Sequence, residues 1–326
     1  MRYILPIGLV AAALASAGML ALPADWGPRQ WLFAAQDGGS VAARNLRSAL
    51  KPERVHAELK TALDARDKHL ADSFVDLAQQ ENIAIDAPLK ERYDRETGGY
   101  IAPVERLVQG LWDGKCSSFE SFAGGQLSDL LSIGDVRDLY NQAGNYRSGK
   151  PTDPLVIGLA AVGVFSTAVI PFHAATSMIK GLAKAERLSP LFRRELTEAL
   201  ASGLDTEAVL KAVPQLSWWD SLPSFGWESW LPDLSWPLVT EKLPQLVSAL
   251  SSGVQLSKLG TFNQLVGNVV TLVSNAGVCG AEDALTLAQG SGDLERLARL
   301  SEQRKGATAA VLKLLGRDAL QLPDAG

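Results

Sequence analysis

Two long apolar segments constrain this chain more than any other feature of its sequence. Residues 3–22 carry no charged side chain, and residues 154–179 contain no Lys, Arg, Asp or Glu, so His173 is the one titratable side chain there. A helix of about 20 apolar residues spans the hydrocarbon core of a bilayer. A mean hydropathy of +0.05 agrees with one or two such helices beside a larger water-exposed part.

Residues 1–24 have two interpretations, and both of them export the chain that follows. Ala15-Ser16-Ala17 has the small-x-small pattern of a signal-peptide cleavage site after an apolar region. Against cleavage, the hydrophobic run continues to Leu22, and Trp26 and Trp31 follow where interfacial anchors lie. We favour an uncleaved N-terminal transmembrane anchor over a signal peptide.

Residues 151–182 form the second apolar segment, and its flanks predict the topology of the chain. The positive-inside rule places the flank after it in the cytoplasm, so residues 25–150 would form an extracytoplasmic domain between two anchors. The alternative is a buried core helix of a soluble domain, because Pro171 can kink or end the helix. The basic residues of the second flank are Lys180, Lys184, Arg187, Arg193 and Arg194.

The remaining sequence predicts a mainly α protein, because strand-like alternation is nearly absent. Apolar residues at three- to four-residue steps predict one amphipathic helix over 52–80, and a further helix begins near Asp86. Within the helical region 183–326, the C-terminal tail predicts a helical hairpin. Asp293 caps its first helix and Thr308 begins its second.

A tryptophan-rich segment over residues 218–236 holds five of the eight tryptophans of the chain, interleaved with prolines. Tryptophan favours positions with one apolar and one wet edge, so this segment predicts contact with a membrane interface or with a partner protein. A loop pinned to its own protein by tryptophan anchors is the alternative. The residues of this candidate interaction surface are Trp218, Trp219, Trp227, Trp230 and Trp236.

Residues 243–278 again predict helix, with several Asn and Gln side chains. These amides favour helices buried in protein over a third bilayer crossing. Together with His173, Asn268 and Asn275 are the one set of polar side chains that a transport or channel accessory subunit would use.

No motif in the sequence indicates a cofactor, a metal site or nucleic-acid binding. The chain has 31 basic and 36 acidic side chains, three histidines and no His-Glu-x-x-His, Walker or Gly-x-Ser-x-Gly pattern. Asp135 and Asp138 would share one face of a helix, as an acid/base pair requires. Asp135 also follows Gly134, and we favour the interpretation that it caps a helix over 136–142.

Cys116 and Cys279 are the two cysteines of the chain. A pair of cysteines in an exported protein predicts a disulfide. The two-anchor topology conflicts with that prediction, because it places Cys116 outside the cytoplasm and leaves Cys279 inside it or in the membrane. A disulfide would therefore argue that residues 154–179 do not cross the bilayer.

Two stretches carry a resemblance to a group of proteins. The stretch Ser128-Asp129-Leu130 with residues 133–139, and the tail residues 293–300 with Leu314-Leu315-Gly316, resemble uncharacterised α-helical bacterial membrane proteins of the cell envelope. The resemblance implies an envelope location and no catalytic residue.

These observations predict an inner-membrane protein with no enzymatic activity, which serves as an envelope scaffold or assembly component. Its expected partners are the lipid bilayer and other envelope proteins, with domain 25–150 in the periplasm. A membrane-bound hydrolase that uses Asp135 and Asp138, and a transport or channel accessory subunit, are the alternatives.

Overall fold

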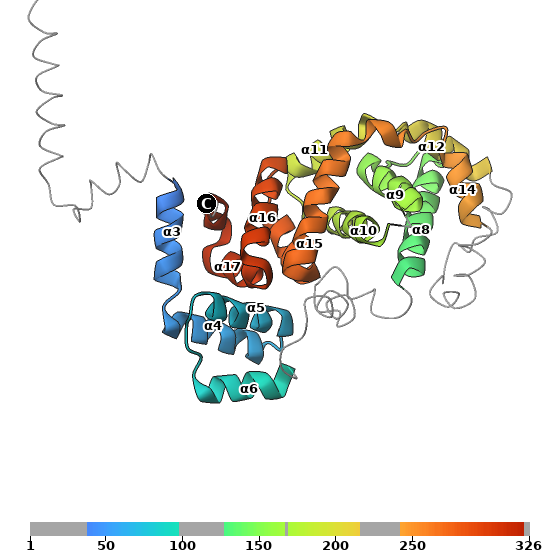
Figure 1. Cartoon of the computed structure of the whole chain (residues 1–326). Coiled ribbons are helices and arrows are strands. Elements are labelled where there is room, and N and C mark those ends of the chain that lie inside the picture. Colours follow the sequence, from blue (N-terminus) through green and yellow to red (C-terminus); the bar gives the residue numbers. More distant parts are fainter. Residues whose placement is uncertain (1–37, 98–126, 167–168, 216–241, 323–326) are drawn as a thin grey trace, which may run out of the picture.

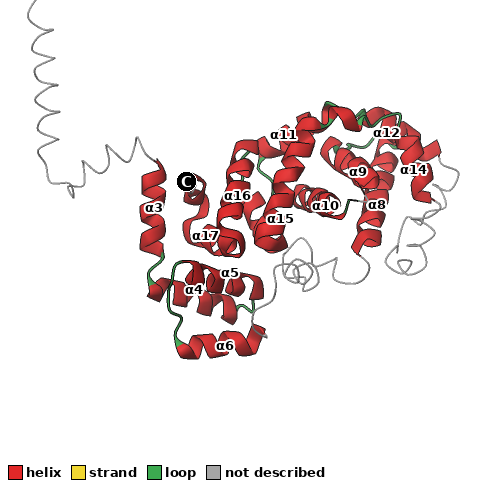
Figure 2. Cartoon of the chain, viewed as in Figure 1, coloured by secondary structure: helices red, strands yellow, loops and turns green. Residues whose placement is uncertain are grey.

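The computed structural model of this protein describes residues 38–97, 127–166, 169–215 and 242–322 (Figure 1). Every regular element in these ranges is a helix, and the β pairing recorded there is one antiparallel bridge between Leu204 and Val254 (Figure 2). The prediction of a mainly α fold is therefore confirmed for the described part of the chain.

The helices form three groups along the sequence. The N-terminal group is α3 (Gly38–Ala49), α4 (Pro52–Asp64), α5 (Lys68–Gln80) and α6 (Ala87–Thr97). The central group is α8 (Leu127–Arg147), α9 (Pro154–Ser166), α10 (Ile170–Lys184), α11 (Pro190–Ala201), α12 (Thr206–Ala212) and α14 (Leu243–Leu250). The C-terminal group is α15 (Gly260–Leu287), α16 (Ser291–Arg304) and α17 (Thr308–Leu315). Short 3-10 turns η2 (Val213–Gln215), η6 (Leu256–Lys258), η7 (Lys305–Ala307) and η8 (Gly316–Gln321) join or end them.

The C-terminal helices lie between the other two groups (Figure 1). On one side α17 packs against α3 and α5, and on the other side α15 packs against α10 and α11. One hydrophobic core therefore includes residues of all three groups, such as Phe74 of α5, Phe192 of α11 and Phe262 of α15. A second, smaller core joins α8, α9, α12 and α14.

The predicted single helix over 52–80 is wrong, because the chain forms two helices there. The break falls at Arg66, whose φ of 56° ends α4, and the Asp67 carboxylate accepts the Leu70 N–H at 2.9 Å to cap α5. The apolar spacing runs on across the break because α4 and α5 face the same core.

The predicted membrane helix over 151–182 is not formed as one helix. Residues 154–166 form α9 and residues 170–184 form α10, with Pro171 in the first turn of α10, where a proline needs no N–H partner. The two helices pack against each other, and eleven of the thirteen residues of α9 are buried. Among the described residues, no helix has both the length and the apolar character needed to span a bilayer.

The C-terminal tail forms the predicted pair of helices, but the prediction that Asp293 caps the first of them is wrong, because Gly290 occupies the N-cap position. α16 begins at Ser291, and the Asp293 carboxylate in its first turn accepts the Gln289 N–H at 2.9 Å. α17 begins at Thr308, as predicted. Residues 243–278 lie in α14 and the first part of α15, which contribute buried side chains to the two cores.

Several predictions concern residues outside the described ranges. The N-terminal segment 1–24, Cys116 and the tryptophan-rich segment 218–236 all lie there, so those predictions stay predictions.

Candidate functional site

The densest group of buried ionisable side chains lies between α8 and α10, and it is the candidate site of this protein. Asp135 and Asp138 are 1% and 3% exposed, and they face three side chains of α10. We call this set the charge cluster; its members are Asp135, Asp138, His173, Lys180 and Lys184.

The sequence spacing explains why these five side chains meet. Asp135 and Asp138 are three residues apart, and His173, Lys180 and Lys184 follow at steps of seven and four, so each set lies on one face of its helix. Arg137, which is about one-third exposed, reaches the edge of the same site, because its Nη2 lies 3.7 Å from Asp138 Oδ1. The expectation that the two aspartates share a face is therefore confirmed. The predicted capping role of Asp135 is wrong, because α8 begins at Leu127, two turns earlier.

Lys180 is the centre of the charge cluster. Its ammonium donates to Asp135 Oδ1 and lies 3.0 Å from Asp138 Oδ2, while Lys184 donates to Asp138 Oδ1 at 2.7 Å. Two carboxylates and two ammonium groups thus neutralise each other; Asp135, Asp138 and Lys180 are buried, whereas the Lys184 side chain is 42% exposed. Buried charges are tolerated when they are paired in this way.

Within the charge cluster, one ring nitrogen of His173 faces Asp135 and the other faces the backbone of α9. Nδ1 lies 3.0 Å from the Gly163 carbonyl oxygen, which can only accept, so we assign the proton of the neutral ring to Nδ1. Nε2 is then an acceptor, and it lies 3.7 Å from Asp135 Oδ2, a second acceptor. Both atoms lack a hydrogen-bond partner, as expected for two lone pairs that face each other.

Gly163 of α9 lets the backbone approach this site. A Cβ atom built on Gly163 would overlap the Asp135 carboxylate. A glycine at this position is therefore a steric requirement of the charge cluster.

The pKa values follow from burial and from these contacts. Burial raises the pKa of Asp135 to about 6, although the nearby Lys180 opposes the shift. For Asp138, burial acts in the same direction, but Lys180 and Lys184 together hold its pKa below the ordinary value. Burial and then the Lys180 charge lower the pKa of His173 to about 4. Burial also acts to lower the pKa of Lys180, yet the two aspartates raise it above its ordinary value.

The charge cluster lies apart from three cavities in the described part of the chain. Three cavities are lined by described residues of α4 to α6, of α15 to α17 and of the turns between them, and none of the three includes a member of the charge cluster. Each aspartate is occupied by an ammonium group. The described residues also contain no group of three or more His, Cys, Asp or Glu side chains that would hold a metal ion.

Other sequence-predicted residues are dispersed. His173 lies in the charge cluster, whereas Asn275 lines a cavity beside His69, so these two members of the proposed transport set belong to different sites. Cys279 is disulfide-bonded, and the one other cysteine of the chain, Cys116, lies outside the described residues.

Sequence reasoning missed the two lysines of the charge cluster. Lys180 and Lys184 were assigned to a cytoplasmic flank because they follow an apolar segment. Asp residues at i, i+3 and Lys residues at i, i+4 lie on two helices joined by a short apolar one, but this spacing does not by itself show that the two helices meet.

Comparison of the chain with models of protein families, with curated proteins and with solved structures found no match. The geometry of the chain alone therefore supports the proposals below.

Proposed function

We propose that this chain is a non-enzymatic helical scaffold of the bacterial envelope, with its entire helical body on the extracytoplasmic side. The observation that carries the proposal is the disulfide at Cys279, in the middle of α15. Disulfides persist in oxidising compartments and are rare in the cytoplasm. The apolar segment 154–179 precedes α15 in the chain. If α15 lies outside the cytoplasm, that segment need not cross the membrane.

The ion pairs of the second flank support the same topology. Positive charge after an apolar segment normally indicates a cytoplasmic flank, but here each of the five basic side chains has a carboxylate partner within the body. Lys180 and Lys184 contact the aspartates of the charge cluster, and the other pairs are Arg187–Glu282, Arg193–Asp153 and Arg194–Glu198. Folding accounts for these charges, so they need not report on membrane topology.

The internal position of the charge cluster supports a scaffold rather than an enzyme. Its carboxylates are paired with ammonium groups between α8 and α10. A buried ion cluster of this kind contributes a specific helix arrangement more readily than net stability. The N-terminal segment would hold the body at the membrane.

Fusions of alkaline phosphatase after Asp94 and after Gly203 test the topology. The enzyme is active only when exported, so the proposal predicts activity at both positions. Activity at Asp94 alone would restore the two-anchor model and sink the proposal. The matched control is the same pair of fusions without residues 1–24, in which both should be inactive.

A further inference from the structure

A cavity lies where α15 breaks, at the contact of the C-terminal helices with α5. Its volume is about 420 Å³, and its walls come from α5, from α15 around Gly277 and from the turn η7. This volume falls in the range of about 300–1,000 Å³ that is usual for small-molecule sites. We call it the kink cavity.

The break in α15 builds one wall of the kink cavity. Gly277 has a φ of 73° and a ψ of 175°, so the helical hydrogen-bond pattern is interrupted there. His69 Nε2 lies 2.8 Å from the Ala276 carbonyl oxygen and satisfies a group that the break releases. A Cβ on Gly277 would come within 3.0 Å of the same His69 nitrogen, so the break and the imidazole fit closely together.

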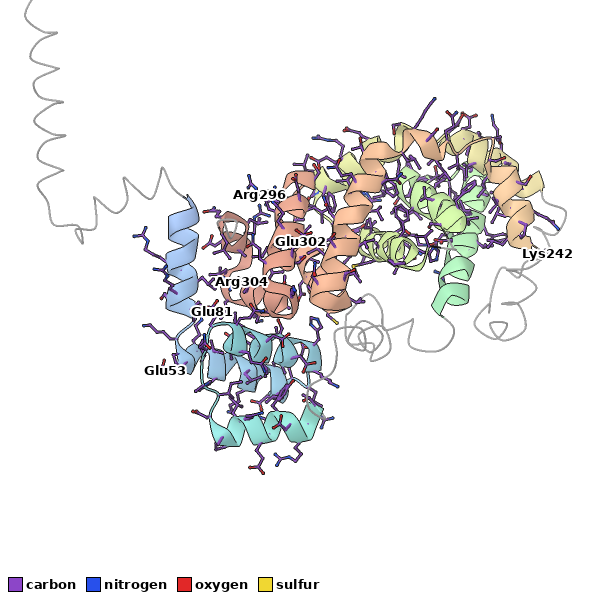
Figure 3. All side chains as sticks on the ribbon, viewed as in Figure 1. Glu53, Glu81, Lys242, Arg296, Glu302 and Arg304 are labelled. Atoms are coloured by element: carbon purple, nitrogen blue, oxygen red, sulfur yellow. The ribbon has the colours of Figure 1, made fainter. Side chains whose placement is uncertain are left out.

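The turn η7, which follows α16, forms another wall of the kink cavity and contributes the ammonium group of Lys305. Lys305 has a φ of 45°, which non-glycine residues seldom adopt. The preceding residue is fixed to the end of α5, because Arg304 Nη1 lies 2.6 Å from Glu81 Oε1 and Gln80 Nε2 donates to the Arg304 carbonyl at 2.9 Å (Figure 3). Within the part of the chain that the structure describes, Lys305 has no ion-pair partner.

The chemistry of the lining selects a class of ligand. The lining side chains are polar or small, and the largest purely apolar group among them is the methyl of Ala276. Asp76 supplies a negative charge and Lys305 a positive one, and Gln79, Ser274 and Asn275 add amides and a hydroxyl. Asp76 already interacts with another part of the chain, but a carboxylate can accept several hydrogen bonds.

We propose that the kink cavity binds a small zwitterion, a free amino acid or a dipeptide. The ligand's carboxylate would pair with Lys305 and its ammonium group with Asp76, while the amides and the hydroxyl bind the remaining polar atoms. A lining with one charge of each sign matches a molecule with one charge of each sign. This inference goes beyond the scaffold function and does not depend on the side of the membrane where the body lies.

Thermal unfolding of the full-length protein in detergent tests the proposal. A ligand that binds only the folded state raises the melting temperature in a saturable way. We expect such a rise with L-alanine or L-alanyl-L-alanine. N-acetyl-L-alanine lacks the ammonium group and L-alaninamide lacks the carboxylate. The affinity of each should therefore be lower than that of L-alanine by a factor of about ten or more.

The variant Lys305→Asn removes the cation and leaves a polar side chain in its place. It should weaken zwitterion binding by about tenfold or more, since a charge-assisted contact is lost. Lys258→Asn, at an exposed lysine of η6, is the matched control and should bind as the wild type does. The proposal is overturned if no zwitterion gives a saturable shift, if sorbitol gives the same shift, or if Lys305→Asn binds like the control.

Discussion

Protonation of Asp135 and protonation of His173 change the stability of the folded state in opposite directions as the pH falls. Burial raises the pKa of Asp135 from 3.8 to about 6, so the folded state binds this proton more tightly than the unfolded state. Its contribution to stability grows as the pH falls from about 6 toward 3.8. Burial lowers the pKa of His173 from 6.5 to about 4, so its contribution is complete above pH 6.5 and is lost as the pH falls toward 4.

The two effects occupy the same pH window, so we expect them to offset each other largely in the wild type. The variant His173→Asn keeps a donor for the Gly163 carbonyl. When the pH is lowered from 7 to 4.5, its free energy of unfolding should rise relative to that of the wild type. Asp135→Asn should have the opposite effect and lose stability over the same interval. Urea unfolding at both pH values measures these differences. Changes of the same sign in both variants would contradict the assignment.

The sequence alone shows the aspartates of this site but not their partners. An i, i+3 pair of aspartates is visible in any helix, and the shared face of Asp135 and Asp138 was predicted correctly. Their burial depends on α10, whose lysines lie about 45 residues further along the chain. No local pattern shows which distant helix will cover a given face, and the local sequence at Gly134 therefore favours a helix cap at Asp135.

At the scale of the helices, the hydropathy of α9 does not distinguish lipid from protein surroundings. Both environments favour the same apolar side chains, and α9 is buried by α8, α10 and α11 rather than by a bilayer. Length was the informative signal. The most apolar stretch, 155–170, is shorter than the about 20 residues that a crossing needs, and Pro171 fits the first turn of a new helix.

The crossing of α9 over α8 gives a prediction at this scale. Gly163→Ala places a methyl group against the buried Asp135 carboxylate, where the neighbouring Lys180 leaves little room to move. Overpacking of this kind costs about 1–3 kcal/mol. Gly144→Ala in α8 is the matched control, because nothing lies within 4 Å of its Cβ position and a helical Gly→Ala change stabilises by about 0.5–1 kcal/mol. Denaturant unfolding should therefore separate the two variants, and equal stabilities would show that the crossing tolerates a side chain.

At the scale of the whole molecule, the C-terminal helices join parts of the chain that are far apart in sequence. α17 contacts α3 and α5, α15 contacts α10 and α11, and Asn45 Nδ2 of α3 donates to Asp318 Oδ2 of η8 at 3.2 Å. The sequence predicted the tail as a helical hairpin because its caps and apolar spacing are local. Its central place in the fold was not predictable, because the residues that it contacts carry no local sign of that pairing.

The disulfide at Cys279 adds a covalent link to this arrangement, and it gives the last prediction. Cys279 lies just after the break of α15, two residues from Gly277. We expect Cys116 to be its partner, since the chain has no third cysteine. A bond between these positions closes a loop of about 160 residues, and removing a native disulfide typically costs about 2–5 kcal/mol of stability.

Cys279→Ser and Cys116→Ser should therefore lower the free energy of unfolding by the same amount, because each removes the same bond. The double variant should lose no more than either single variant, as expected for two residues that act as one unit. Wild-type protein treated with dithiothreitol should unfold at the denaturant midpoint of the variants, whereas the variants should not respond to the reductant. Because one hydrophobic core includes residues of all three helix groups, we expect a single cooperative transition in every case. Additive losses in the double variant would show that the two cysteines are not bonded to each other, and would remove the observation on which the extracytoplasmic topology rests.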